Sequence, residues 1–227
     1  MTLPLNLGHP DRLFIGGEWI APRNASRLKM FNPSTEELLF EVAEAGPDEV
    51  DLAVAAARKA FDHGPWPRTA PAERAAMMRK LGAVLERRCA ELDAAWIGQV
   101  GVPVSMARGS GIGASMLLSY YADLAEKTVF EDVRPSQGFV SKYAVVVKES
   151  VGVVAAVNPW NGPLMGMFMK VAPALAAGCT IVMKPSPETP LETFLIAEAA
   201  EEVGFPAGVL NLLPADREMS DRLISHP

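Results

Sequence analysis

Two short segments, each directly after an apolar run, carry side chains that could do chemistry. The first is 158–163, with the sequence NPWNGP, in which two prolines fix the backbone. Its Asn161 offers an amide NH₂ just before an expected helix, and such a donor can stabilise an oxyanion. Taken alone, this residue favours the simpler role of a helix cap.

The second segment is 184–190, with the sequence KPSPETP, and it begins with Lys184 at the expected end of a strand. A proline-stiffened turn after the lysine can hold its ammonium group over the edge of a sheet, toward a ribose or a phosphate. A solvated lysine near a helix that Thr189 caps, with Pro190 at its first position, explains the same residues equally well.

The second half of the chain predicts the scaffold for both segments. Strands and helices are expected to alternate, with strands at 151–157, 180–183 and 209–213 and helices at 164–177, 191–203 and 216–225. This alternation is typical of a parallel sheet with helices on both faces. Because ligands bind beyond the carboxyl ends of such strands, both segments lie where a site is expected.

The first half of the chain predicts a hairpin followed by helices. A glycine pair between short apolar runs indicates a hairpin at 12–20, and the composition of 32–35 indicates a turn. Helical periodicity is expected at 47–63, from Pro71 through Trp96, and at 105–127. Residues 139–147 are rich in Val and Tyr, which favours a strand. The fold class is therefore α/β, with a helical N-terminal third.

The composition limits the partners. The 227 residues are 49% apolar, which is enough to bury a core, and their net charge of -6 argues against binding nucleic acid or anionic lipid. Residues 151–169 carry no charge, but the prolines and asparagines in their middle argue against a membrane-spanning helix.

Three further features limit location and metal binding. Residues 1–10 lack the basic and apolar parts of a secretory signal. Cys89 and Cys179 lie far apart, which indicates packing cysteines in a reducing, cytoplasmic setting, and three scattered histidines predict no metal site. The segment 109–113 (GSGIG) has the wrong spacing for a dinucleotide loop and predicts small residues on a helix packing face.

Over almost its whole length the sequence resembles the aldehyde dehydrogenase superfamily. The matching segments keep their order and spacing, and they are 14–19, 31–33, 55–61, 152–161, 173–179, 184–186 and 204–211. The resemblance implies NAD or NADP as cofactor and a thiohemiacetal mechanism. In this mechanism a cysteine attacks the aldehyde, hydride passes to NAD(P)⁺, and water hydrolyses the thioester.

The resemblance also implies roles for individual residues. Asn161 matches the side-chain donor of the oxyanion hole, and Lys170 matches a lysine near the catalytic centre. The expected cofactor-binding residues are Pro159, Trp160, Lys184, Ser186 and Pro187. The glycine-rich turn, the general-base glutamate and the nucleophilic cysteine of the family are expected after residue 227, so this chain alone is expected to be inactive.

Two positions depart from the family pattern. Pro187 stands where many NAD-preferring members have a glutamate that accepts from the ribose, and Glu188 is not expected to replace it, so we expect tolerance of NADP as well as NAD. Gly162 stands where an aromatic residue often lines the substrate tunnel. With Met165 and Met169 on the same helical face, it predicts a wide tunnel for long or bulky apolar aldehydes. Both methionines fit ordinary core packing equally well.

By the same resemblance the chain is divided into three parts. Residues 1–134 are expected to form the hairpin and helical part of the cofactor domain, and 151–227 an incomplete Rossmann-like core. Residues 135–150 are expected to be a bridging strand segment through which family members form homo-oligomers. Two alternatives stay open: a non-catalytic nucleotide-binding fragment or pseudoenzyme, and an acylating semialdehyde dehydrogenase that uses coenzyme A.

Overall fold

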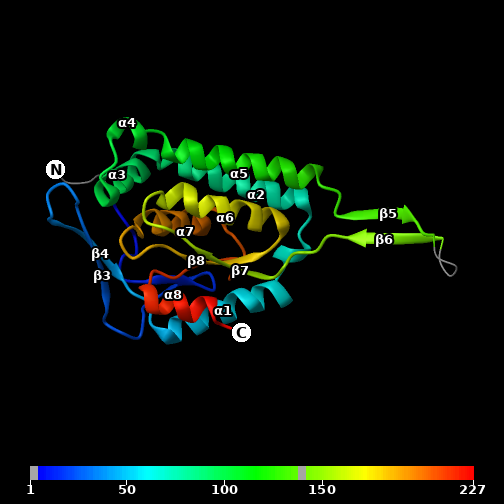
Figure 1. Cartoon of the computed structure of the whole chain (residues 1–227), viewed down its shortest axis with the longest axis horizontal. Helices are drawn as coiled ribbons and strands as arrows, with labels where there is room; N and C mark the ends of the chain where they lie inside the picture. Colours follow the sequence, from blue (N-terminus) through cyan, green and yellow to red (C-terminus); the bar gives the residue numbers. More distant parts are fainter. Residues whose placement is uncertain (1–4, 138–141) are drawn as a thin grey trace.

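The computed structural model describes residues 5–137 and 142–227, and a three-stranded parallel sheet lies at its centre (Figure 1). The strands are β7 (Val153–Val157), β8 (Thr180–Lys184) and β9 (Leu210–Leu212), in the order β7-β8-β9. The register places Val157 beside Lys184 at the carboxyl end of the sheet. Every residue of the middle strand β8 is buried, as its apolar sequence predicts.

Helices cover both faces of this sheet (Figure 1). The helices α6 (Pro163–Ala177) and α7 (Leu191–Val203) pack on one face, and α1 (Pro47–His63) and α8 (Arg217–Ile224) pack on the other. The predicted α/β class is therefore confirmed. The helices expected at 47–63 and 191–203 have the predicted bounds.

A further layer of helices lies outside α6 and α7. It consists of α2 (Pro71–Arg87), α3 (Cys89–Val100) and α5 (Ser110–Lys127), with a one-turn 3₁₀ helix at Trp66–Arg68 before α2. Glycine allows α2 and α5 to approach closely, because a Cβ atom at Gly111 would lie 2.4 Å from the carbonyl oxygen of Leu85. The segment 109–113 thus serves helix packing, as predicted.

The single helix expected at 105–127 is wrong. A short helix α4 (Val104–Ala107) ends first, and α5 begins only at Ser110. Gly109 separates them with a φ of 88°, a left-handed conformation that glycine adopts without steric cost. Asp93 then accepts hydrogen bonds from the backbone N–H groups of Gly109 and Ser110, at 3.1 and 3.0 Å, and so fixes the start of α5.

The N-terminal hairpin is confirmed. It contacts a residue in the C-terminal part of the sequence. Its strands are β1 (Leu13–Ile15) and β2 (Glu18–Ile20). The backbone N–H of Gly16, in the turn, donates to Oδ1 of Asn211 at 2.9 Å, across 195 residues of sequence.

Two further antiparallel strand pairs contain strands that were not predicted. The strands β3 (Arg27–Phe31) and β4 (Leu38–Ala43) pair antiparallel around the expected turn. The strands β5 (Glu131–Pro135) and β6 (Tyr143–Val147) form a ribbon that projects from the body (Figure 1). The strand expected at 139–147 is thus present from Tyr143 onward, while 139–141 lie outside the described residues.

The uncharged stretch 151–169 consists of β7, a loop and the first turns of α6. Within residues 5–137 and 142–227, no helix has the length and apolar character needed to cross a bilayer.

Candidate functional site

Both chemically distinctive segments leave the same edge of the central sheet. One follows β7 and the other follows β8, and these strands are adjacent and parallel. The two segments are joined at their origin, because the backbone N–H of Asn158 donates to the carbonyl oxygen of Lys184 at 3.0 Å. The predicted strand–helix–strand crossover is therefore present, with α6 as the crossover helix.

Lys184 is almost entirely buried as a residue. Its residue is only 3% exposed, and within the described part of the chain no hydrogen bond or ion pair reaches its Nζ. Burial lowers the pKa of Lys184, while the nearby carboxylates of Glu188 and Asp216 oppose this shift. An ammonium at the end of a buried side chain, without a partner among the described residues, favours an acceptor supplied by a ligand. A nucleotide ribose, with its hydroxyl groups, fits this description.

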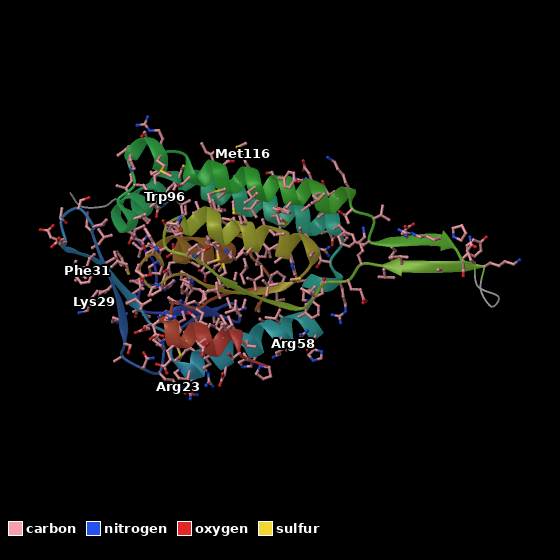
Figure 2. All side chains as sticks on the ribbon, viewed as in Figure 1. Arg23, Lys29, Phe31, Arg58, Trp96 and Met116 are labelled. Carbon is pink, nitrogen blue, oxygen red and sulfur yellow. The ribbon has the colours of Figure 1, made fainter. Side chains whose placement is uncertain are left out.

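The backbone of Asn161 is hydrogen-bonded to another element, and its side-chain amide is available to bind a ligand. Its carbonyl oxygen accepts a hydrogen bond of 3.2 Å from Nε1 of Trp96, which lies on α3 (Figure 2). The residue is exposed, and among residues 5–137 and 142–227 its side-chain amide has no hydrogen-bond partner. The role of helix cap is wrong for Asn161, because Gly162 occupies the N-cap of α6 and Pro163 its first position.

The cap expected at Thr189 is also wrong. Pro190 occupies the N-cap position of α7, so the helix starts one residue later than that alternative required. The hydroxyl group of Thr189 is buried, and in the described ranges it has no hydrogen-bond partner.

Lys170 is held against the first segment by Asn158. Its Nζ donates to Oδ1 of Asn158 at 3.2 Å and to the carbonyl oxygen of Gly166 at 2.8 Å. The Asn158 amide in turn donates to the carbonyl oxygen of Pro163 at 2.8 Å. Burial lowers the pKa of Lys170. Sequence reasoning did not single out Asn158, although a polar amide at the end of an apolar strand was a usable signal.

The expected cofactor-binding residues lie along the two segments. Pro159 and Trp160 are exposed, and Pro187 is half-buried. The hydroxyl of Ser186 donates to the carboxylate of Glu188, which turns this side chain back over the second segment. The same carboxylate opposes the lowering of the Lys184 pKa, so a negative charge lies near this lysine.

The expected tunnel positions differ in how open they are. Among the residues that the structure describes, a Cβ atom at Gly162 would have no heavy atom within 4 Å. Met169 is 65% exposed, so it is not core filler, whereas Met165 is half-buried with its Sδ 3.5 Å from the Cβ position of Gly113 on α5. Met116, also on α5, is exposed as well (Figure 2). The start of α6 thus presents apolar side chains without a covering layer among the described residues.

Neither cysteine belongs to this site. Cys89 opens α3, and its Sγ donates to Asp93 at 3.8 Å. Cys179 is buried at the amino end of β8, the end opposite Lys184. In the part of the chain that the structure describes, no three His, Cys, Asp or Glu side chains form a group that could hold a metal ion.

These features define an α/β protein with a candidate ligand site at the carboxyl ends of its parallel strands. Residues 19–227 match the model of the aldehyde dehydrogenase family, and the chain belongs to this family.

Relatives and solved structures agree with this assignment. The chain is 42% identical over 218 residues to the geranial dehydrogenase of Castellaniella defragrans, covering 96% of this chain and 45% of that protein. It is 38% identical to the aminoacetaldehyde dehydrogenase of Pseudomonas aeruginosa, covering 100% of this chain and 45% of the relative. The Mycobacterium tuberculosis aldehyde dehydrogenase complexed with NAD⁺ superposes with a TM-score of 0.91 at 38% identity, over 98% of this chain and 46% of that one. This chain therefore spans less than half the length of these relatives.

Proposed function

We propose that this chain is the N-terminal, cofactor-binding part of an enzyme that oxidises aldehydes to carboxylic acids with NAD or NADP. One observation carries the proposal: Lys184, a buried residue whose ammonium has no partner among the described residues, and the available amide of Asn161 come from neighbouring segments at one sheet edge. The likeness to a solved relative complexed with NAD⁺, and to an E. coli relative named NADP/NAD-dependent aldehyde dehydrogenase PuuC, supports it.

In this proposal each residue has a defined task. Lys184 donates from its ammonium to a ribose hydroxyl, with Pro159, Trp160, Ser186 and Pro187 around the nucleotide. Asn161 donates to the aldehyde oxygen as that oxygen gains negative charge, and Lys170 lies beside this centre. When bound, NAD(P)⁺ supplies the hydride acceptor. The nucleophilic cysteine and the general base are proposed to lie outside these 227 residues, so the chain alone is inactive.

The proposed substrates are apolar aldehydes of medium or large size. The open position at Gly162 and the exposed Met169 leave space along the start of α6. The name of the relative at 42% identity, a geranial dehydrogenase, supports this class.

The ribbon of β5 and β6 is proposed as the arm through which the complete protein forms a homo-oligomer. All five residues of β6 are exposed, and most of them are apolar. A surface of this kind is stabilised when a second copy covers it. The proposed place of action is the cytoplasm, where two unpaired cysteines are stable.

Equilibrium binding of NAD⁺ and NADP⁺ to the 227-residue chain tests the cofactor part of the proposal. We expect Lys184→Met to weaken binding about tenfold or more, because it removes a charge-assisted hydrogen bond. Lys80→Met, on the exposed face of α2, is the matched control and is expected to bind as the wild type does. Equal binding by both variants would contradict the assignment of Lys184.

Aldehyde oxidation tests the catalytic part. We expect activity from a protein that continues past residue 227 with a cysteine-bearing half, and none from the chain alone. Activity of the chain that survives Cys89→Ser and Cys179→Ser would show that the mechanism is wrong. Nucleotide binding without oxidation in the longer protein would support a pseudoenzyme, and a requirement for coenzyme A would support an acylating enzyme.

A further inference from the structure

We propose that Asn158 is the positioning residue of this site, and that it holds the Asn161 segment and the Lys170 ammonium in one fixed arrangement. The inference rests on the proposed function, since it concerns how the oxyanion donor and its neighbouring lysine are oriented. Asn158 itself is not proposed to touch substrate or cofactor, because its residue is only 5% exposed.

Both ends of the Asn158 amide are used. Its Nδ2 donates to the carbonyl oxygen of Pro163 at 2.8 Å, which ties the end of β7 to the first residue of α6. Its Oδ1 accepts from Nζ of Lys170 at 3.2 Å. Asn161 lies between the two residues joined by the first bond, so that bond closes the loop on which the oxyanion donor sits. Only a side chain with both a donor and an acceptor can make these two bonds at once.

The backbone of Asn158 connects this arrangement to the nucleotide side of the site. Its N–H donates to the carbonyl oxygen of Lys184, so one residue contacts both segments. This bond involves no side-chain atom and survives any substitution except proline. Changes in the side chain are therefore expected to alter the Asn161 and Lys170 side and to spare cofactor binding.

The helix α6 leaves space for the Asn158 amide at Gly166. A Cβ atom at Gly166 would lie 2.6 Å from Oδ1 of Asn158, which is closer than real contacts allow. The carbonyl oxygen of Gly166 is the second acceptor for Lys170, at 2.8 Å. The absence of a side chain at Gly166 therefore makes room for the amide, and the two residues form a functional pair.

The decisive experiment is a double-mutant cycle in the longer, catalytically complete protein. We expect Asn158→Ala to lower kcat about 100-fold, since a small misplacement of reacting groups has this effect. We expect the dissociation constant for NADP⁺ to be unchanged. Gly166→Ala is expected to lower kcat similarly, because its methyl group displaces the amide, and to cause little further loss once Asn158 is alanine. Asn158→Asp, which keeps the acceptor for Lys170 and loses the donor to Pro163, is expected to show an intermediate kcat and serves if the alanine variant does not fold.

A second measurement does not depend on activity. In the 227-residue chain, the rate at which acetic anhydride modifies Lys170 is followed by peptide mass spectrometry, with exposed Lys80 as the internal standard. Loss of the Asn158 acceptor is expected to make Lys170 react faster relative to Lys80.

The outcomes distinguish a failure of the positioning role from a failure of the proposed function. An unchanged acetylation rate in Asn158→Ala overturns the proposal, and so does a changed rate with an unchanged kcat in an active enzyme. Additive losses in the double-mutant cycle also overturn it, because they would show two independent structural effects. If the complete wild-type protein oxidises no aldehyde, the proposed function fails, whereas faster acetylation of Lys170 in Asn158→Ala would still show that Asn158 holds Lys170.

Discussion

Gln99 on α3 donates a hydrogen bond of 2.7 Å to the carboxyl group of Glu192 in the first turn of α7. The carbonyl oxygen of the same amide accepts from the backbone N–H of Leu191 at 3.1 Å, so Gln99 also caps this helix from another element. Glu192 is completely buried, and burial raises its pKa to about 8. The folded protein therefore holds a proton on Glu192 at neutral pH.

This proton makes stability depend on pH. The folded protein retains it up to a pKa of about 8, whereas a glutamate in the unfolded chain loses it near 4.5, so the free energy of unfolding falls as pH rises between these values. Glu192→Gln is expected to remove this slope and to be a few kcal/mol more stable than the wild type above the upper value. Urea unfolding across this pH range measures the effect. Glu73→Gln, on the exposed side of α2, is the control, and identical slopes for wild type and Glu192→Gln would contradict the prediction.

The close approach of α2 and α5 predicts a large difference between two glycines of one helix. Gly111→Ala would place a methyl group 2.4 Å from the Leu85 carbonyl oxygen, so we expect a loss of about 1–3 kcal/mol in unfolding free energy. Gly113→Ala meets only the Met165 Sδ, at 3.5 Å, and is expected to be neutral or stabilising by up to about 1 kcal/mol. Thermal and urea unfolding compare the two. Equal changes in unfolding free energy for the two variants would show that α2 and α5 can move apart without loss of stability, and would contradict the prediction.

The oxyanion role predicts a specific kinetic change. In the complete enzyme, Asn161→Ala is expected to lower kcat about 10²–10³-fold, because a donor to the developing negative charge is lost. Cofactor affinity is expected to stay the same. Trp96→Phe removes the hydrogen bond that holds the Asn161 carbonyl at 3.2 Å but keeps the amide, and a smaller loss is expected. A normal kcat for Asn161→Ala would exclude this role.

We expect the choice between NAD⁺ and NADP⁺ to depend on the charge near Lys184. We expect the wild type to bind NADP⁺ and NAD⁺ with similar affinity, and we expect Pro187→Glu to weaken NADP⁺ binding alone, because a new carboxylate repels the 2′-phosphate. Glu188→Gln removes the carboxylate that the structure places beside Lys184, and we expect it to improve NADP⁺ binding. Titration with both cofactors measures these effects. A wild type that prefers NAD⁺ by about a hundredfold or more would contradict the first expectation.

The preference for long over short aldehydes is expected to depend on the open space at Gly162. Gly162→Phe fills the space in which a Cβ atom has no neighbour within 4 Å in the described part of the chain. We expect kcat/KM for an aldehyde of about ten carbons to fall relative to acetaldehyde, while the wild type prefers the longer substrate. A clear wild-type preference for acetaldehyde would refute the assignment.

The central sheet and its helices could be predicted because their signals are local. The apolar strand 180–183 and the helix 191–203 are recognisable from runs of a few residues. The strand Arg27–Phe31 had a usable signal too, since its Leu28 and Met30 alternate with exposed residues, yet sequence reasoning passed over it. Glu131–Pro135 has no apolar run, and it becomes a strand through its pairing with β6.

In the candidate site, too, some features could be predicted from local sequence and others could not. The positions of Asn161 and Lys184 followed from strand ends, which local patterns reveal. The burial of Lys184 and the capping of α7 by Gln99 could not be predicted, because they depend on contacts between distant elements; Gln99 and Leu191 are 92 residues apart. The clash that requires glycine at 166 likewise depends on where the Asn158 side chain points.

The hydrogen bond from Gly16 to Asn211 has a consequence for synthesis on the ribosome. Residue 16 emerges early, but its acceptor follows 195 residues later, which corresponds to roughly 10–40 s of translation. Throughout that delay the first strands have no finished surface on which to dock. The hairpin turn can therefore dock on Asn211 only after β9 has been made, so this contact of the N-terminal hairpin forms late in synthesis.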